Sequence, residues 1–260
     1  MDLIKHIEEN FFAVCRYWGN LNFSFTQAGS IGTMNTGVAI ADINWVWNEK
    51  PLTNNDAKSI ADIKEFYQKI NLRFWWWIYP CGQSPETSRI LQDTGFRLIE
   101  KCPCMAVELN DSASYEKSPD NVIISPVRNK NDLRIWEDIS FHGFEMPQRV
   151  RKQYGAFVSS FDLGAQSPQK LFLAYFEEKP VATSLLFTHN NSAGIYYVST
   201  LPAFRNKGFG LKITQAAMQA AKKSGFKNVI LQATSLGAKV YIRAGFKECC
   251  RADIYKLSAL

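Results

Sequence analysis

The pattern that most constrains the fold occurs twice in the chain. In each copy, a strand-like run is followed by a short helical segment, a glycine, a phenylalanine and a last strand-like run. The first copy centres on Gly95 and Phe96 and the second on Gly245 and Phe246, so the two glycines lie 150 residues apart. Repetition of one order of elements indicates a duplicated structural unit. The sequence therefore predicts two similar units in tandem.

Strands and helices alternate through both units. Helices are expected at residues 3–17, 54–70, 88–94, 131–139, 147–161, 211–223 and 237–243, from apolar spacing and capping residues. Strands are expected at residues 38–47, 74–79, 96–109, 122–125, 171–177, 181–188, 195–200, 228–233 and 246–257. This order predicts an α/β (α+β) fold.

A polar segment separates the two units. Residues 110–120 are rich in serine, aspartate and asparagine and contain a proline, a composition typical of linkers. The predicted domains are therefore residues 1–109 and residues 121–260.

Composition argues against several classes of protein. Of the 260 residues, 46% are hydrophobic and 21% are charged, which suits a globular chain with a substantial core. The formal net charge of +6 comes without the dense basic tracts of a nucleic-acid-binding protein. The first residues do not resemble an export signal, and the most apolar run, residues 74–79, is too short to span a bilayer. We therefore expect a cytoplasmic protein without nucleic-acid or membrane partners.

The cysteines are interpreted as structural residues with reduced thiols. Cys102 and Cys104 are separated by one residue, and Cys249 and Cys250 are adjacent, so neither pair has the spacing of a zinc site. A protein without an export signal is expected in a reducing compartment. We expect no metal ion.

The run Trp75, Trp76 and Trp77 is a second candidate for a special role, as an aromatic platform for a ligand. Alternate residues on a strand face opposite sides, so Trp76 should oppose its two neighbours. We interpret the run as core packing.

One loop is suited to bind a phosphate group. Residues 197–211 read as a strand, a turn broken by Pro202, and a loop that opens a helix. Free backbone N–H groups at the start of a helix form a site for phosphate. Gly208 and Gly210 allow a ligand to approach the backbone closely, and two cationic side chains lie beside them. The loop therefore predicts a nucleotide-like cofactor held by its pyrophosphate.

Three stretches of the second unit together resemble the GNAT superfamily of N-acetyltransferases. Residues 198–202 stand where the superfamily has the strand before its cofactor loop. Residues 205–210 match the loop pattern of the superfamily, which is Arg or Gln, two residues of any type, Gly, one residue of any type, and then Gly or Ala. Tyr241 lies four residues before the second Gly-Phe pair. The resemblance covers residues 120–260 well and residues 1–109 only through the repeated ending.

The resemblance implies a fold and a mode of cofactor binding. It implies two tandem GNAT-like units, each a mixed, mostly antiparallel twisted sheet flanked by helices. The loop would hold the pyrophosphate of acetyl-CoA, and the preceding strand, which splays from its neighbour in this superfamily, would offer backbone groups to the pantetheine arm. The residues implied are Val198, Ser199, Thr200, Arg205, Asn206, Lys207, Gly208, Phe209, Gly210, Leu211 and Ser235. Helix N-capping explains Ser235 equally well.

Tyr241 is implied as the general acid. A phenol with a pKa near 10 is a suitable proton donor to a leaving thiolate of similar basicity. The alternative is a half-buried aromatic residue on a short helix. The general base stays open among His142, Glu145, His189, Tyr196, Tyr197 and a chain of waters.

The first unit departs from the pattern where the cofactor would bind. The loop motif does not occur between Trp47 and Tyr67, and Leu91 stands at the position that matches the tyrosine. Glu49 and Asp56 would repel phosphates. We therefore expect acetyl-CoA in the second unit alone, with a degenerate first unit that covers the sheet or shapes the acceptor pocket.

These features predict an enzyme that transfers an acetyl group from acetyl-CoA to a primary amine by direct attack in a ternary complex. The acceptor, a small molecule or a peptide, and the oligomeric state are not predicted. An aminoacyl-tRNA-dependent transferase is disfavoured. Such enzymes need no CoA loop, whereas this chain has the intact loop pattern at residues 205–210. The remaining alternative is a non-catalytic acyl-CoA sensor or partner-binding module.

Overall fold

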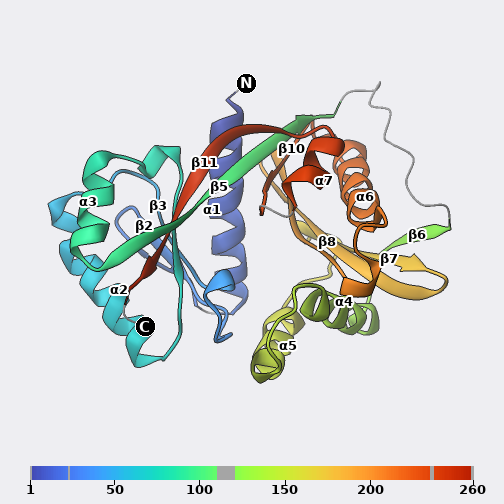
Figure 1. Ribbon diagram of the computed structural model, residues 1–260, viewed down its shortest axis with the longest axis horizontal. Coiled ribbons are helices and arrows are strands. Elements are labelled where there is room, and N and C mark those ends of the chain that lie inside the picture. The colour runs from blue at the N-terminus through green and yellow to red at the C-terminus, as the bar shows by residue number, and fades with distance from the viewer. Residues whose placement is uncertain (1, 23, 110–120, 235–236, 259–260) are drawn as a thin grey trace. The chain divides into compact units, whose positions relative to one another are not determined.

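The computed structural model describes residues 2–22, 24–109, 121–234 and 237–258, so the predicted linker and Ser235 lie outside the described residues. The helices are α1 (Leu3–Leu21), α2 (Ala57–Lys69), α3 (Pro85–Asp93), α4 (Lys130–Gly143), α5 (Arg151–Ser159), α6 (Phe209–Lys223) and α7 (Ala238–Arg243) (Figure 1). The strands are β1 (Thr26–Ala28), β2 (Ile31–Met34), β3 (Trp45–Asn48), β4 (Trp75–Ile78), β5 (Phe96–Glu108), β6 (Val122–Pro126), β7 (Gln169–Phe176), β8 (Lys179–His189), β9 (Ser192–Thr200), β10 (Asn228–Gln232) and β11 (Lys247–Leu257).

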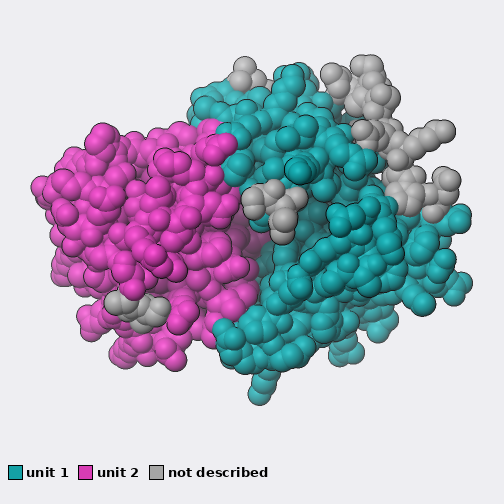
Figure 2. All heavy atoms as spheres, in the orientation of Figure 1, with its two compact units in different colours: residues 1–11, 103–249 teal, residues 12–102, 250–260 magenta. Residues whose placement is uncertain are grey.

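The chain forms two compact units whose limits differ from the expected domains 1–109 and 121–260. Unit 1 contains residues 1–11 and 103–249, and unit 2 contains residues 12–102 and 250–260 (Figure 2). Hydrogen bonding between strands explains the difference. The second half of β5 pairs with β10 in unit 1, with Met105 opposite Leu231. The end of β11 pairs with β4 in unit 2, with Ile254 opposite Trp77.

From β3 in unit 2 and from β9 in unit 1, the order of elements is the same in both units, as the repeat predicts. In each unit one parallel strand pair, β3 with β4 or β9 with β10, is joined through a helix, α2 or α6, and the neighbouring pairs are antiparallel. The short helices α3 and α7 then end at Gly95 and Gly245, whose φ angles of 93° and 92° are in the left-handed region that favours glycine. This arrangement confirms the predicted mixed, mostly antiparallel sheets flanked by helices.

Unit 1 is a sheet with helices on both faces. Its strand order is β5-β10-β9-β8-β7-β6. Helix α6 packs on one face through Phe209, Ile213 and Met218, which join a buried cluster with Leu186 and Ile195 of the sheet. Helices α4 and α5 lie on the other side of the sheet (Figure 1). There the Trp136 indole N–H donates to the Ser184 carbonyl at 3.2 Å.

The first turns of α1 are held on unit 1 by a buried amide. Asn10 is fully buried, and its side-chain N–H groups donate to the carbonyl of Ser192 at 3.3 Å and to its hydroxyl at 3.1 Å. The Tyr196 hydroxyl donates to the Asn10 carbonyl oxygen at 2.8 Å. A Cβ at Gly194 would collide with this amide, so glycine at this position admits the helix.

Replacing Asn10 with alanine should destabilise the full-length protein by about 1–3 kcal/mol, because it leaves the buried Tyr196 hydroxyl and Ser192 carbonyl without this partner. The measurement is the free energy of unfolding in urea. Lys5→Ala, an exposed change on the same helix, is the control and should alter stability by less than about 0.5 kcal/mol. An equal effect of the two changes would contradict the prediction.

Aromatic side chains fill unit 2 on both faces of its sheet. Trp76 joins a buried cluster with Ile60 and Ile63 of α2, and Trp77 contacts the ring of Trp45 at 6.1 Å between centroids. The predicted core packing is therefore confirmed for Trp76 and Trp77, which take part in different contacts.

The strand expected over residues 38–47 is largely wrong. Residues Ala41–Ile43 form a 3₁₀ turn, and the strand is limited to β3. The buried side chain of Asn44 explains the difference. It donates to the carbonyls of Val38, Ile40 and Arg73 at 2.7–2.9 Å and accepts from the N–H of Thr36, which satisfies the backbone without a strand partner.

Three of the six cysteines, Cys15, Cys102 and Cys104, are buried. Of the helices that the structure describes, none is long and apolar enough to cross a membrane.

Candidate functional site

The candidate site begins where β9 separates from β10. The two strands are paired in parallel at only two positions, Val229 with Ala193 and Ile230 with Gly194. The rest of β9, residues 195–200, continues without a described ladder partner on the β10 side. Backbone groups of this segment that face away from β8 are therefore available to a ligand, with the exception of the Thr200 carbonyl, which accepts from the Arg205 side chain at 3.3 Å.

A bulge in β9 fixes the direction of this free segment. Tyr197 has a positive φ of 51°, and the register with β8 shifts between Thr183 and Leu185. The Thr183 hydroxyl donates to the Tyr197 carbonyl at 2.9 Å and lies 2.7 Å from the Ser199 hydroxyl. The Ser199 side chain is thus held inside the protein, so its contribution to a ligand would come from its backbone.

The loop after β9 ends in a helix start that no side chain caps. Asn206 and Gly208 have positive φ angles of 60° and 86°, and α6 begins directly afterwards at Phe209. The side chains of Phe209 and Leu211 are buried in the core. The first N–H groups of a helix have no partner within the helix, and Lys212 is the first to bond back, to the Gly208 carbonyl. The backbone here therefore has the character of an anion site.

The two cationic side chains of the loop bind the protein rather than point away from it. Arg205 donates to the Glu145 carboxylate at 2.7 Å and to the Gly143 carbonyl at 2.8 Å. Lys207 donates to the Ala203 carbonyl at 3.1 Å. Arg205 thus joins the loop to the end of α4, and we infer that the backbone, more than these side chains, is suited to hold a pyrophosphate.

The end of α4 approaches β9 closely because of a glycine that the sequence analysis did not single out. A Cβ at Gly143 would lie 2.6 Å from the Ser199 hydroxyl oxygen. Gly143 also supplies a carbonyl to Arg205. In a sequence, a glycine in the last turn of a helix is commonly interpreted as the end of the helix. Nothing in the local sequence indicates that Gly143 also contacts a strand more than 50 residues away.

Tyr241 lies on α7, which closes the other side of the helix start. A Cβ at Gly210 would lie 3.6 Å from the Thr200 hydroxyl and 3.9 Å from Val240, so β9, α6 and α7 meet here. The ring of Tyr241 packs against Phe246, with centroids 6.0 Å apart. Burial raises the pKa of the Tyr241 phenol, which therefore keeps its proton across the physiological range.

The candidate bases lie in different surroundings. His189 lies opposite Ser192, at the far end of β9 from Thr200, a distance of about 25 Å along a strand. Tyr196 is bound to Asn10. Tyr197 packs against Trp136 and Phe144, and burial raises the pKa of its phenol.

The other two candidates lie at the end of α4 near the loop. Glu145 is bound by Arg205, and His142 lies 3.4 Å from the Asp138 carboxylate. Within the described ranges, no group of three or more His, Cys, Asp or Glu residues is arranged to hold a metal ion.

The corresponding helix in unit 2, α2, is preceded by a 3₁₀ turn, Asn54–Asp56, with a capping box of its own. In this box the Asp56 carboxylate accepts from the Thr53 backbone N–H at 2.8 Å and from the Thr53 hydroxyl at 3.0 Å. Asp56 is also the N-cap residue of α2, so a negative charge that would repel an anionic ligand lies at the start of this helix.

Comparison with known proteins finds a similarity in one part of unit 1. Residues 167–248 match the family model described as Acetyltransferase (GNAT) domain. No curated protein sequence matches the chain. Residues 167–248 of unit 1 are therefore similar to a GNAT acetyltransferase domain.

Solved structures with low sequence identity share the fold. A GCN5-related N-acetyltransferase from Kribbella flavida has a TM-score of 0.73 at 16% identity, with 96% of each chain covered. A GCN5-related N-acetyltransferase from Sphaerobacter thermophilus has a TM-score of 0.63 at 16% identity, over 87% of this chain and 76% of that one. A tandem GNAT protein from the clavulanic acid biosynthesis pathway has a TM-score of 0.57 at 11% identity, over 88% and 80%.

Proposed function

We propose that unit 1 transfers an acetyl group from acetyl-CoA to a primary amine of a small molecule or a peptide. The observation that carries this proposal is the juxtaposition of a free segment of β9 with the uncapped start of α6. The N–H groups of Phe209, Gly210 and Leu211 would bind the pyrophosphate, and the backbone of Val198 and Thr200 would bind the pantetheine arm. We place no acetyl-CoA in unit 2, because the negative charge of Asp56 at the start of the equivalent helix would repel a pyrophosphate.

The proposed reaction is direct attack on the thioester. The amine attacks the acetyl carbonyl carbon, and the carbon–sulfur bond of the resulting tetrahedral intermediate then breaks. Tyr241 donates its phenolic proton to the leaving sulfur, and the attacking nitrogen releases a proton to solvent. Backbone N–H groups of β9 would stabilise the negative charge on the carbonyl oxygen.

The test is calorimetric titration of the full-length protein with acetyl-CoA, using two variants of Gly210. A Cβ fits at this position, because its nearest contact is at 3.6 Å, so Gly210→Ala should retain the fold and most of the binding. Gly210→Glu should weaken binding at least about 100-fold, since a carboxylate would meet the pyrophosphate. Gly210 is preferred to Gly208, where the positive φ would add backbone strain.

Absence of acetyl-CoA binding by the wild-type protein would overturn the proposal. Equal binding by wild type and Gly210→Glu would show that the cofactor binds elsewhere. Release of CoA in the presence of a panel of primary amines tests the transfer step, and binding without any release would favour a sensor over an enzyme.

A further inference from the structure

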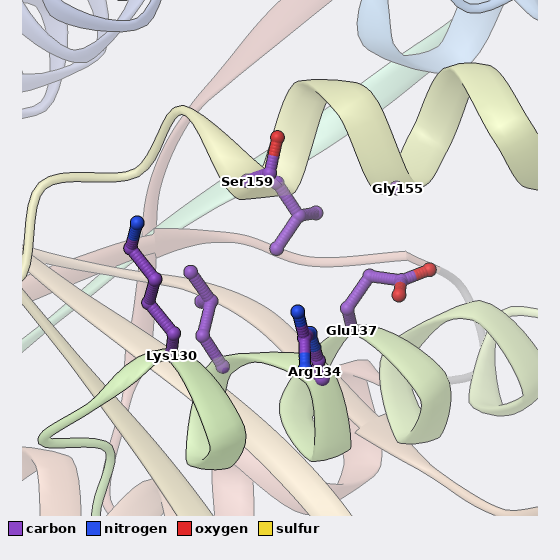
Figure 3. Close-up of a pocket in the computed structure, with 7 residues that line it drawn as sticks. Lys130, Arg134, Glu137, Gly155 and Ser159 are labelled. Carbon is purple, nitrogen blue, oxygen red and sulfur yellow. The ribbon is translucent and has the colours of Figure 1, made fainter.

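A hollow in unit 1 lies between α4 and α5, away from the proposed acetyl-CoA site. Its volume is about 310 Å³, and it is lined by Lys130, Leu133, Arg134, Glu137, Gly155, Val158 and Ser159. In Figure 3 the side chains of Lys130, Arg134 and Glu137 rise from α4 toward α5, which carries Gly155 and Ser159. We call this hollow the α4–α5 groove.

The groove lies at the end of α4 that is remote from the cofactor loop. Lys130 begins the helix, whereas Gly143 ends it and contacts Ser199 and Arg205. Thirteen residues of helix separate Lys130 from Gly143, which corresponds to about 20 Å. The groove is therefore a separate place on the same unit.

Two cations lie at one rim of the groove without an ion pair. Among the described residues, the side chains of Lys130 and Arg134 have no hydrogen-bond or carboxylate partner. Glu137 could in principle pair with Arg134, three residues before it. Instead it pairs with Arg151 at 3.2 Å, and Arg151 also binds Asp138 at 3.0 Å. Glu137 thus has its own cationic partner, which it shares with Asp138, and the rim formed by Lys130 and Arg134 keeps its positive charge.

A glycine in the middle of α5 widens the groove. Gly155 lies inside a helix of nine residues, where glycine is less favourable than alanine. Its backbone does not need glycine, because its φ lies outside the positive region. Packing does not need it either, because a Cβ would come no closer than 3.6 Å to any atom, the nearest being a Glu137 oxygen. The missing side chain leaves space that nothing in the protein fills.

The inner wall of the groove is apolar. Leu133 is 6% exposed, and Val158 is fully buried beneath the groove. The Ser159 hydroxyl donates to the Ala156 carbonyl at 2.7 Å, so its oxygen can only accept a further hydrogen bond. The groove thus combines an apolar wall with the hydrogen-bond donors of the Lys130 and Arg134 side chains.

We propose that the α4–α5 groove binds a small organic anion, a carboxylate or a phosphate monoester with a compact apolar body. The anionic group pairs with Lys130 and Arg134, and the apolar body lies against Leu133 and Val158 in the space at Gly155. Small-molecule sites of this kind combine an apolar wall with a few convergent polar groups. This site is independent of the acetyl-CoA site.

The test is calorimetric titration of the full-length protein with phenyl phosphate. Saturable binding is expected, and inorganic phosphate and benzyl alcohol, which each represent half of the ligand, should bind at least about tenfold more weakly. Arg134→Glu should weaken phenyl phosphate binding at least about tenfold, while Lys152→Glu, a matched charge reversal outside the groove, should leave it unchanged.

Two glycine variants distinguish groove filling from unfolding. Gly155→Ala should raise the melting temperature, because alanine favours helix, and Gly155→Leu should abolish phenyl phosphate binding by filling the groove.

Gly210→Glu should leave phenyl phosphate binding unchanged, which separates this site from the cofactor loop. No saturable binding, equal binding of inorganic phosphate, or equal binding by Arg134→Glu would each overturn the proposal.

Discussion

Residues 121–260 expressed alone should fail to form a cooperatively folded protein, although this stretch contains the whole matched GNAT segment. It would lack residues 104–108 of β5, which pair with β10, and residues 1–11, which include the first turns of α1. It would also carry the end of β11 without β4, its partner in unit 2.

The expected loss is large compared with the stability of a domain. Met105 and Ala106 of β5 are 3% and 4% exposed, and Ile7 of α1 is fully buried. Burial of a large apolar side chain contributes about 1.5–3 kcal/mol, and the net stability of a domain is only about 5–15 kcal/mol. Removing β5 would also leave the backbone groups of β10 unpaired on that side.

The measurement is thermal unfolding followed by circular dichroism, with the full chain as reference. As a matched control, a protease site placed within residues 110–120 of the full chain should be cleavable without loss of structure. The two fragments should then elute together from a size-exclusion column, since each supplies strands to both units. A cooperative transition of the isolated 121–260 fragment near that of the whole chain would contradict the prediction.

Tyr241→Phe should lower the rate of acetyl transfer by about 10²–10⁴-fold while changing the affinity for acetyl-CoA by less than about threefold. This prediction rests on the proposed function. The phenylalanine ring keeps the contact with Phe246, so the fold and the binding surface should persist, and the change removes only the hydroxyl that donates the proton.

The pKa of Tyr241 sets the expected pH dependence. Because burial raises this pKa, the phenol stays protonated, and activity should not decline with rising pH until well beyond the usual tyrosine pKa. If Tyr241 acted as a general base instead, activity would rise with pH, because a base is active only after it has lost its proton.

Steady-state kinetics and calorimetry of the same preparations check the tyrosine prediction. Tyr196→Phe is the matched control, because it also removes one buried tyrosine hydroxyl, but that hydroxyl is bound to Asn10. The control should lose stability and keep its rate. A rate for Tyr241→Phe within about twofold of wild type would remove Tyr241 from the acid role.

Local sequence pattern predicted the type of most elements that position the site. The helix expected at residues 211–223 is α6, Phe209–Lys223, and the strand expected at residues 195–200 is the end of β9. The glycines at 95 and 245 end their helices as predicted. These features depend on spacing and backbone conformation within a few residues, which a sequence displays directly.

Tertiary structure decided the features that join distant residues. Arg205 is predicted as a phosphate ligand from its place in the loop, yet it binds Glu145, 60 residues away. Likewise, the repeat predicts two strands at the ends of the two copies but not that the second half of β5 pairs in unit 1 and the end of β11 in unit 2. The partner of a strand or of a charged side chain is decided by contacts between distant segments. The alternation of apolar residues in a strand is the same whichever neighbouring strand it pairs with, so the sequence pattern does not identify that neighbour.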